Sequence, residues 1–272
     1  YASLIVRMFR NKKGFKFSGA VHELVEPSME GGNAKVDASN ISIHHYGNSN
    51  PQALKKKMKF YLELCKKKAK ENQNSKAYYE LGVIQNQNEN QKEAIEAFKK
   101  SIELDEKNSK SLFELGVIYE KEGNLSEAIK ALQKSLLISK SATSLRHLGL
   151  CLFRKGEFSG AKQALVLSLK SNPNNPSTYN ILASVLEKQD NFKESINASL
   201  ISIKLNPTNH IAYFNLGLVY DRMNQSPNAI SNYEKAVELG HKNKDAINKR
   251  FEELRNLDVK PADFSFSFGI GE

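Results

Sequence analysis

Basic side chains offer the clearest chemistry in this sequence, because four of them could together receive a carboxylate. They are Lys121, Arg146, Arg154 and Lys188. Arg146 and Arg154 are about two helical turns apart, so both would project from one side of a helix. The sequence contains no Gly-x-x-x-x-Gly-Lys phosphate loop, no Gly-x-Ser-x-Gly nucleophile elbow and no His-Glu-x-x-His pair. Recognition of a ligand is therefore favoured over covalent catalysis.

A repeat of about 34 residues must position these side chains. Each unit has a leucine followed by a small residue, and these pairs recur at spacings of 34, 33, 34 and 34. The small residues are Gly82, Gly116, Gly149, Ala183 and Gly217. Further small residues follow, first at Ala94, Ala128, Ala161, Ser195 and Ala229, then at Ser101, Ser135, Ser168, Ser202 and Ala236. Small residues let two helices approach closely, so the pattern predicts stacked helix–turn–helix units.

These units resemble the tetratricopeptide repeat, with its large residue, Leu-Gly, Ala, aromatic and Ala in register. The resemblance implies an all-α fold, a right-handed α-α superhelix of about five repeats. We expect the repeats at residues 75–108, 109–141, 142–175, 176–209 and 210–243, followed by a capping helix at 244–258 and a tail at 259–272. The alternating Phe264, Phe266 and Phe268 of the tail either pair with another strand, fold back on the array or are disordered.

In such an array the first helix of each repeat lines a concave groove, and we expect its inward-facing residues to bind a protein or peptide. The candidate residues are Tyr79, Phe113, Lys121, Arg146, Phe153, Arg154, Asn180, Lys188, Phe214 and Arg222. The carboxylate clamp of chaperone-binding family members is not matched, because Val83 and Val117 occupy its ninth position. The alternative is that the groove residues pack against a neighbouring repeat or the tail.

The net charge is concentrated before the repeats, with an excess of eight positive charges in residues 1–74 and of two in residues 75–272. Lysines from Lys55 to Lys70 lie on a predicted amphipathic helix within a linker at 51–74. This helix either caps the array with a solvated face or contacts a membrane surface through anionic lipids. No motif for specific nucleic-acid binding is present.

Residues 1–50 contain three or four short predicted strands, which cannot bury a core alone. We therefore expect them to be a remnant of a larger domain. The runs Arg7-Met-Phe-Arg-Asn, Phe17-Ser-Gly-Ala-Val-His22-Glu23 and Ile43-His44-His45-Tyr46-Gly47 resemble the C-terminal end of family 2 glycosyltransferases.

This second resemblance places His22 and Glu23 near the donor diphosphate and the acceptor of that family. It implies a nucleotide sugar and a divalent metal, Mn²⁺ or Mg²⁺, for the full-length protein. The Asp-x-Asp motif of the family is absent from this chain. We therefore expect this fragment alone to be no enzyme and to hold no cofactor or metal.

Two cysteines, Cys65 and Cys151, are too few for a disulfide framework or a zinc site, so we expect a cytoplasmic protein. Cys151 should pack as a small hydrophobic residue. We expect His147, His210 and His241 to be isolated surface or groove residues on the repeat helices. Three functions stay open: a protein-interaction module, an acceptor-presenting domain of an active glycosyltransferase, and an oligomerisation scaffold.

Overall fold

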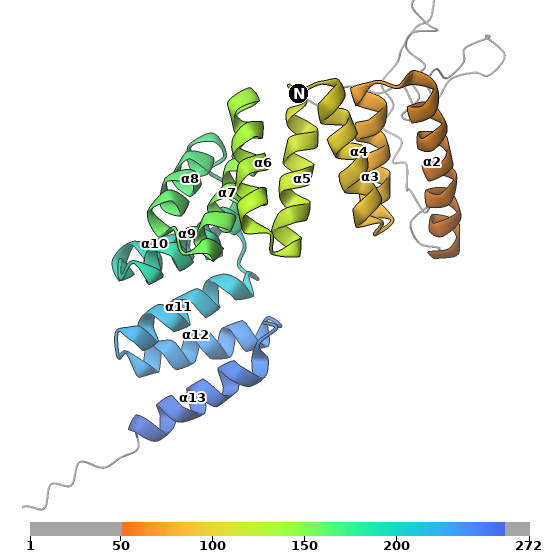
Figure 1. The fold of residues 1–272 in the computed structure, drawn as a ribbon. Helices are drawn as coiled ribbons and strands as arrows, with labels where there is room; N and C mark the ends of the chain where they lie inside the picture. Colours follow the sequence, from red (N-terminus) through yellow and green to blue (C-terminus); the bar gives the residue numbers. More distant parts are fainter. Residues whose placement is uncertain (1–50, 259–272) are drawn as a thin grey trace, which may run out of the picture. The chain divides into compact units, whose positions relative to one another are not determined.

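The computed structural model describes residues 51–258, and all regular secondary structure in that range is helical (Figure 1). The predicted all-α class is therefore confirmed. The predicted strands, His22 and Glu23 within residues 1–50, and the phenylalanine-rich tail at 259–272, lie outside the described residues.

The helices follow one another with short connections. Their bounds are α2 Pro51–Asn72, α3 Ser75–Gln87, α4 Gln91–Leu104, α5 Ser109–Glu122, α6 Leu125–Ile138, α7 Ala142–Lys155, α8 Phe158–Ser171, α9 Pro176–Lys188, α10 Phe192–Leu205, α11 His210–Arg222, α12 Ser226–Glu238 and α13 Lys244–Asp258. The chain forms two compact units that meet within α5, between Ile118 and Tyr119.

In the first unit the basic helix α2 packs on α3. Cys65 and Ala69 of α2 are buried, at 0% and 3% relative exposure. Lys68 of α2 forms an ion pair with Glu80 of α3, and both side chains are largely buried. This packing supports the interpretation of α2 as a cap on the first repeat helix.

In the second unit the helices pack as consecutive pairs, α7 on α8, α9 on α10 and α11 on α12, and α13 packs on α12 (Figure 1). The first helices of these pairs also contact one another, α7 with α9 and α9 with α11. They therefore form one row, which is how a solenoid presents a continuous surface from separate repeats.

Glycine at the eighth position of a repeat brings the two helices of the pair together. A Cβ atom added at Gly217 would lie 2.4 Å from the ring of Tyr233, and one added at Gly149 would lie 2.6 Å from Leu165. Repeat four has Ala183 at this position, and the residue sixteen places later is the smaller Ser199. The small-residue pattern thus reflects close helix approach, as predicted.

Serine hydroxyls join the second helix of a pair to the start of the first. Ser168 Oγ donates to the carbonyl oxygen of Ala142 at 2.7 Å, and Ser202 Oγ donates to that of Pro176 at 3.0 Å. Both serines are buried, so these bonds satisfy polar groups that would otherwise be costly. These bonds hold the two helices of a pair together at the end opposite their internal turn.

The internal turns set the direction of the second helix through a residue in the left-handed region. Gly156, Asp190 and Asn224 hold this place with φ of 85°, 59° and 55°. Asparagine and aspartate tolerate this conformation better than other non-glycine residues. Asp190 is thereby held just beyond the end of α9, next to the candidate site.

Candidate functional site

Three of the predicted groove residues meet at one cavity of about 120 Å³, which is formed by α7, α9 and α11. Phe153 comes from α7, Lys188 from α9 and Phe214 from α11. The cavity is lined by Phe153, Ser184, Glu187, Lys188, Phe214, Asn215 and Leu218. Because it draws on three consecutive repeats, it depends on the solenoid and not on any single helix pair.

Aromatic rings form the apolar part of the cavity. Phe214 stacks on His241 with a centroid separation of 4.4 Å and lies 6.0 Å from the buried ring of Tyr233. Phe153 lies 6.0 Å from Phe158. Both phenylalanines are half-buried, so they are held by their neighbours and still present an accessible face.

A polar network lies under the cavity. Asn215 Nδ2 donates to the carbonyl oxygen of Asn180 at 3.0 Å, and Ser184 Oγ donates to Asn215 Oδ1 at 3.3 Å. Ser202 Oγ also lies 2.7 Å from Asn180 Oδ1, so its single hydrogen is shared between Asn180 and the carbonyl oxygen of Pro176. Asn180 was predicted as a ligand contact, but it is only 6% exposed and its amide is engaged in the network. Asn180 does not line the cavity, but its backbone carbonyl oxygen holds the side chain of Asn215, which does.

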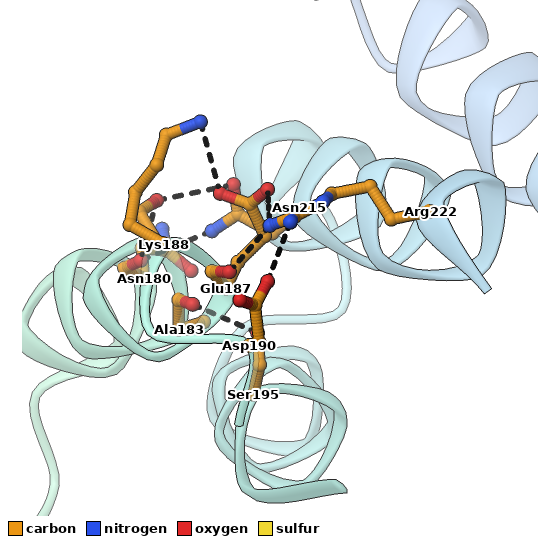
Figure 2. Close-up of polar contacts among 9 residues, drawn as sticks. Asn180, Ala183, Glu187, Lys188, Asp190, Ser195, Asn215 and Arg222 are labelled. Carbon is orange, nitrogen blue, oxygen red and sulfur yellow. Dashed lines mark hydrogen bonds and ion pairs between the residues drawn. The ribbon is translucent and has the colours of Figure 1, made fainter. Parts of the chain in front are cut away.

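Glu187 is the charged centre of the site (Figure 2). Its side chain is 7% exposed, and its carboxylate is 2.9 Å from Arg222 Nη1 and 3.3 Å from Lys188 Nζ. Arg222 Nη1 also donates to the carbonyl oxygen of Glu187 at 2.7 Å, and Nη2 lies 2.5 Å from Asp190. The hydrogen bond with Glu187 raises the pKa of Arg222 above its ordinary value. Arg222 is therefore a structural cation with two internal carboxylate partners.

Glu120, near the end of α5, forms the equivalent centre two repeats earlier. Arg154 Nη1 donates to the carbonyl oxygen of Glu120 at 2.9 Å and lies 3.9 Å from its carboxylate. His147 Nδ1 is 2.6 Å from the same carboxylate, and Arg146 is 3.0 Å from His147 Nε2. Burial lowers the pKa of Arg146.

The predicted receptor of four cations is therefore not assembled as a unit. Arg154 is bound by Glu120, and Lys188 lies beside Glu187. Lys121 is exposed at the end of α5. The sequence pattern grouped the four cations around one incoming carboxylate, whereas Arg154 and Arg222 each bind the acid of the preceding repeat.

We call this arrangement the charge ladder. Its three rungs are Glu120–Arg154, Glu187–Arg222 and Asp221–Arg250. In the last rung, Arg250 of α13 binds both oxygens of Asp221, at 2.8 Å from Nε and 2.7 Å from Nη2. This bidentate contact raises the pKa of Arg250, and it is a geometry in which arginine binds a carboxylate strongly.

The remaining predicted groove residues belong to the first unit. Tyr79 is half-buried with its ring 6.0 Å from Phe98, and burial raises its pKa. Phe113 is half-buried on α5. Neither residue lines the cavity of the second unit.

The expectation of isolated histidines was wrong for all three, because His147 contacts Glu120 and Arg146, and His210 and His241 contact each other. The rings of His210 and His241 are in edge contact, with centroids 5.2 Å apart, because the turn after α12 returns to the start of α11. Within residues 51–258, no group of three or more His, Cys, Asp or Glu side chains could hold a metal ion. No helix in that range is long and apolar enough to cross a membrane.

The sequence carried a signal for the charge ladder that the repeat alignment alone did not use. Glu120 and Arg154 are 34 residues apart, and Glu187 and Arg222 are 35 apart, which is one repeat in both cases. Ser184 and Leu218 occupy the ninth position of their repeats and line the cavity. Asn215 also lines it, and its side-chain amide is bonded to the backbone of α9.

Comparison with known proteins agrees with this geometry. Two family models described as tetratricopeptide repeat match the chain, one at residues 75–108 and the other at residues 97–130 and 200–231. The chain therefore contains tetratricopeptide repeats. No curated protein sequence matches the chain.

Solved structures share the fold. The structure of MamA has 26% identity and a TM-score of 0.56, covering 63% of this chain and 94% of MamA. YrrB, described as a TPR protein with an unusual peptide-binding site, has 18% identity and a TM-score of 0.60, covering 70% of this chain and 98% of YrrB. Yeast Tom70 has 19% identity and a TM-score of 0.57, covering 75% and 45%.

Proposed function

We propose that these tetratricopeptide repeats bind a peptide segment of a partner protein in the groove formed by α7, α9 and α11. The observation that carries the proposal is the cavity, where accessible faces of Phe153 and Phe214 meet polar groups of α9 and α11. Ligand sites commonly combine an apolar lining with a few fixed polar groups. Peptide binding is described for YrrB, which has the same fold.

A second hollow is larger but less suited to specific binding. It measures about 640 Å³ and is lined by Ser159, Lys162, Gln163, Val166, Leu167, Gln189 and Asn191. This hollow lies on one second helix and the turn beside α10, and it contains no aromatic side chain. We therefore assign recognition to the aromatic cavity and use the second hollow as a control surface.

A display library of random short peptides, selected against the whole chain, tests this proposal. We expect selected peptides to lose most of their affinity for a Phe214→Ala variant and to keep it for Leu167→Ser, which alters the second hollow. Truncation of a central aromatic contact commonly weakens an interface by more than about 1 kcal/mol. Selected peptides that bind Phe214→Ala as well as the original protein would refute the groove assignment.

A cytosolic location belongs to the same proposal, because both cysteines are free thiols in buried positions.

The association with a glycosyltransferase rests on the sequence motifs of residues 1–50, and we propose that the repeats present an acceptor to such a domain. Turnover of a nucleotide sugar with Mn²⁺ or Mg²⁺ by the full-length protein, lost when His22 or Glu23 is replaced, would support it. Retention of full turnover by both variants would contradict it.

A further inference from the structure

The charge ladder has a gap at the cavity. Repeats two and four have Glu120 and Glu187 at their twelfth position, whereas repeat three has Phe153 there. The arginine that would bind an acid at this place is replaced by Lys188. The step from α7 to α9 therefore has a cation from the later repeat and an aromatic ring where the earlier repeat would supply a carboxylate.

Lys188 is only partly neutralised at this gap. Its Nζ lies 3.3 Å from Glu187, but the same carboxylate is bound more closely by Arg222 at 2.9 Å. The side chain of Lys188 is 53% exposed, compared with 7% for Glu187. The lysine head group is therefore the charge that an incoming ligand meets, and the carboxylate lies beneath it.

The repeat that contains the gap is also the most basic part of the array. Residues 142–175 contain five basic residues, Arg146, Arg154, Lys155, Lys162 and Lys170, and a single acidic residue, Glu157. Glu157 is 2.7 Å from Lys155. Arg154 and Lys162 are paired with acids of neighbouring repeats, Glu120 and Glu194, which reduces the excess positive charge at this repeat. The remaining excess would speed association with an acidic partner at low salt.

The size of the cavity limits the apolar part of the ligand. Cavities of about 150 Å³ in other proteins hold a benzene molecule. The cavity of about 120 Å³ between Phe153, Phe214 and Leu218 therefore has room for one aliphatic side chain and none for a helix. Residues next to this anchor would lie at the rim, where Lys188 is exposed.

We propose that the gap in the charge ladder is the specificity element of the groove. It takes a peptide segment with an aliphatic side chain in the cavity and an aspartate or glutamate one or two residues away, whose carboxylate binds Lys188. This inference rests on the proposed peptide-binding function and adds the chemistry of the ligand. The peptide supplies the carboxylate that the third repeat lacks.

The peptides selected against the whole chain test the inference directly. We expect enrichment of an aliphatic residue paired with an acidic one, and about tenfold weaker binding when the acid is changed to its amide. Phe153→Glu restores the missing acid within the protein and should weaken these peptides at least as much. Lys188→Met removes the charge and keeps an unbranched side chain at the cavity wall, and Lys193→Met, an exposed lysine of α10, is the matched control.

The outcomes separate the two proposals. Peptides that are lost by Phe214→Ala but contain no acid, or that bind Lys188→Met as well as the original protein, would overturn the specificity element and leave groove binding standing. A library that yields no binder sensitive to Phe214→Ala would overturn both. Binding that needs the acid, weakens with rising salt and fails with Lys188→Met would support the inference.

Discussion

Replacing Gly217 by alanine should destabilise the last repeat although alanine favours helix. The added Cβ would lie 2.4 Å and 2.6 Å from two ring carbons of Tyr233, whereas carbon contacts are normally about 3.5–4.0 Å. The ring is 2% exposed and packs beside Phe214, so it must move by about 1 Å against its neighbours. Overpacking of this kind costs about 1–3 kcal/mol, and the gain in helix propensity offsets about 1 kcal/mol. We expect a net loss of up to about 2 kcal/mol.

The matched control is Gly160→Ala in α8, where the added Cβ would meet Leu152 at an ordinary distance of 3.5 Å. It gains helix propensity without a clash, so its stability should rise by about 0.5–1 kcal/mol. Urea denaturation followed by circular dichroism compares the variants, and hydrogen exchange of the α11 amides locates the change, because repeat arrays can open in segments. If Gly217→Ala were stabilised as much as Gly160→Ala, the close helix approach would be wrong.

Three further predictions follow from buried groups. Ser199 Oγ is buried without a hydrogen-bond partner among the described residues, so Ser199→Ala should be neutral or slightly stabilising. Ser202→Ala leaves a buried hydrogen-bond network unsatisfied and should lower the free energy of unfolding by about 1–3 kcal/mol. Urea denaturation measures both variants. Burial and the adjacent His210 lower the pKa of His241 from its ordinary 6.5, so the folded state favours the neutral ring. The stability that this gives should be fully present above about pH 6.5 and should be lost as the pH falls below that value. Denaturation at a series of pH values measures this dependence. Burial raises the pKa of Cys151 to about 12, so this thiol should resist iodoacetamide in the folded protein and react in urea, as mass spectrometry will show.

Each of these predictions has a clear contrary result. Equal losses for Ser199→Ala and Ser202→Ala would show that the two hydroxyls are not distinguished as the hydrogen bonds indicate. A pH dependence that is unchanged by His241→Phe would assign the acid sensitivity elsewhere. Alkylation of Cys151 at the same rate in the folded and unfolded protein would contradict its burial at 0% exposure.

The fold followed from the sequence because its determinants recur in every repeat. The glycine positions report helix approach, and the structure shows the same contact at Gly149 and Gly217. The serines of the second helices were predicted as small, but their hydrogen bonds to the first residue of each pair were not. A residue that is small and polar does not reveal which of these two properties the position uses.

The site was predicted less completely, because its chemistry depends on which repeat a charge contacts. The inward position of Phe153, Lys188 and Phe214 was read from the repeat register, and the structure brings all three to one cavity. The role of Arg154 was not predicted from the repeat register, because its long side chain reaches the carbonyl oxygen and the carboxylate of Glu120 in the preceding repeat. The register of the repeat therefore does not show whether a long charged side chain contacts its own repeat or the preceding one.

The last rung of the charge ladder has a consequence for where the array can be cut. Arg250 of α13 occupies the role that Arg154 and Arg222 have in the repeats, so the terminal helix imitates the beginning of a further repeat. Removing α13 would leave Asp221 without the cation that binds it. It would also remove Ile247 and Leu254 from the core cluster and so expose Ala229 and Tyr233 to solvent. The repeats are thus modular in sequence but not in chemistry. The acids of repeats two, four and five are each bound by an arginine of the element that follows, and for the last repeat that element is α13.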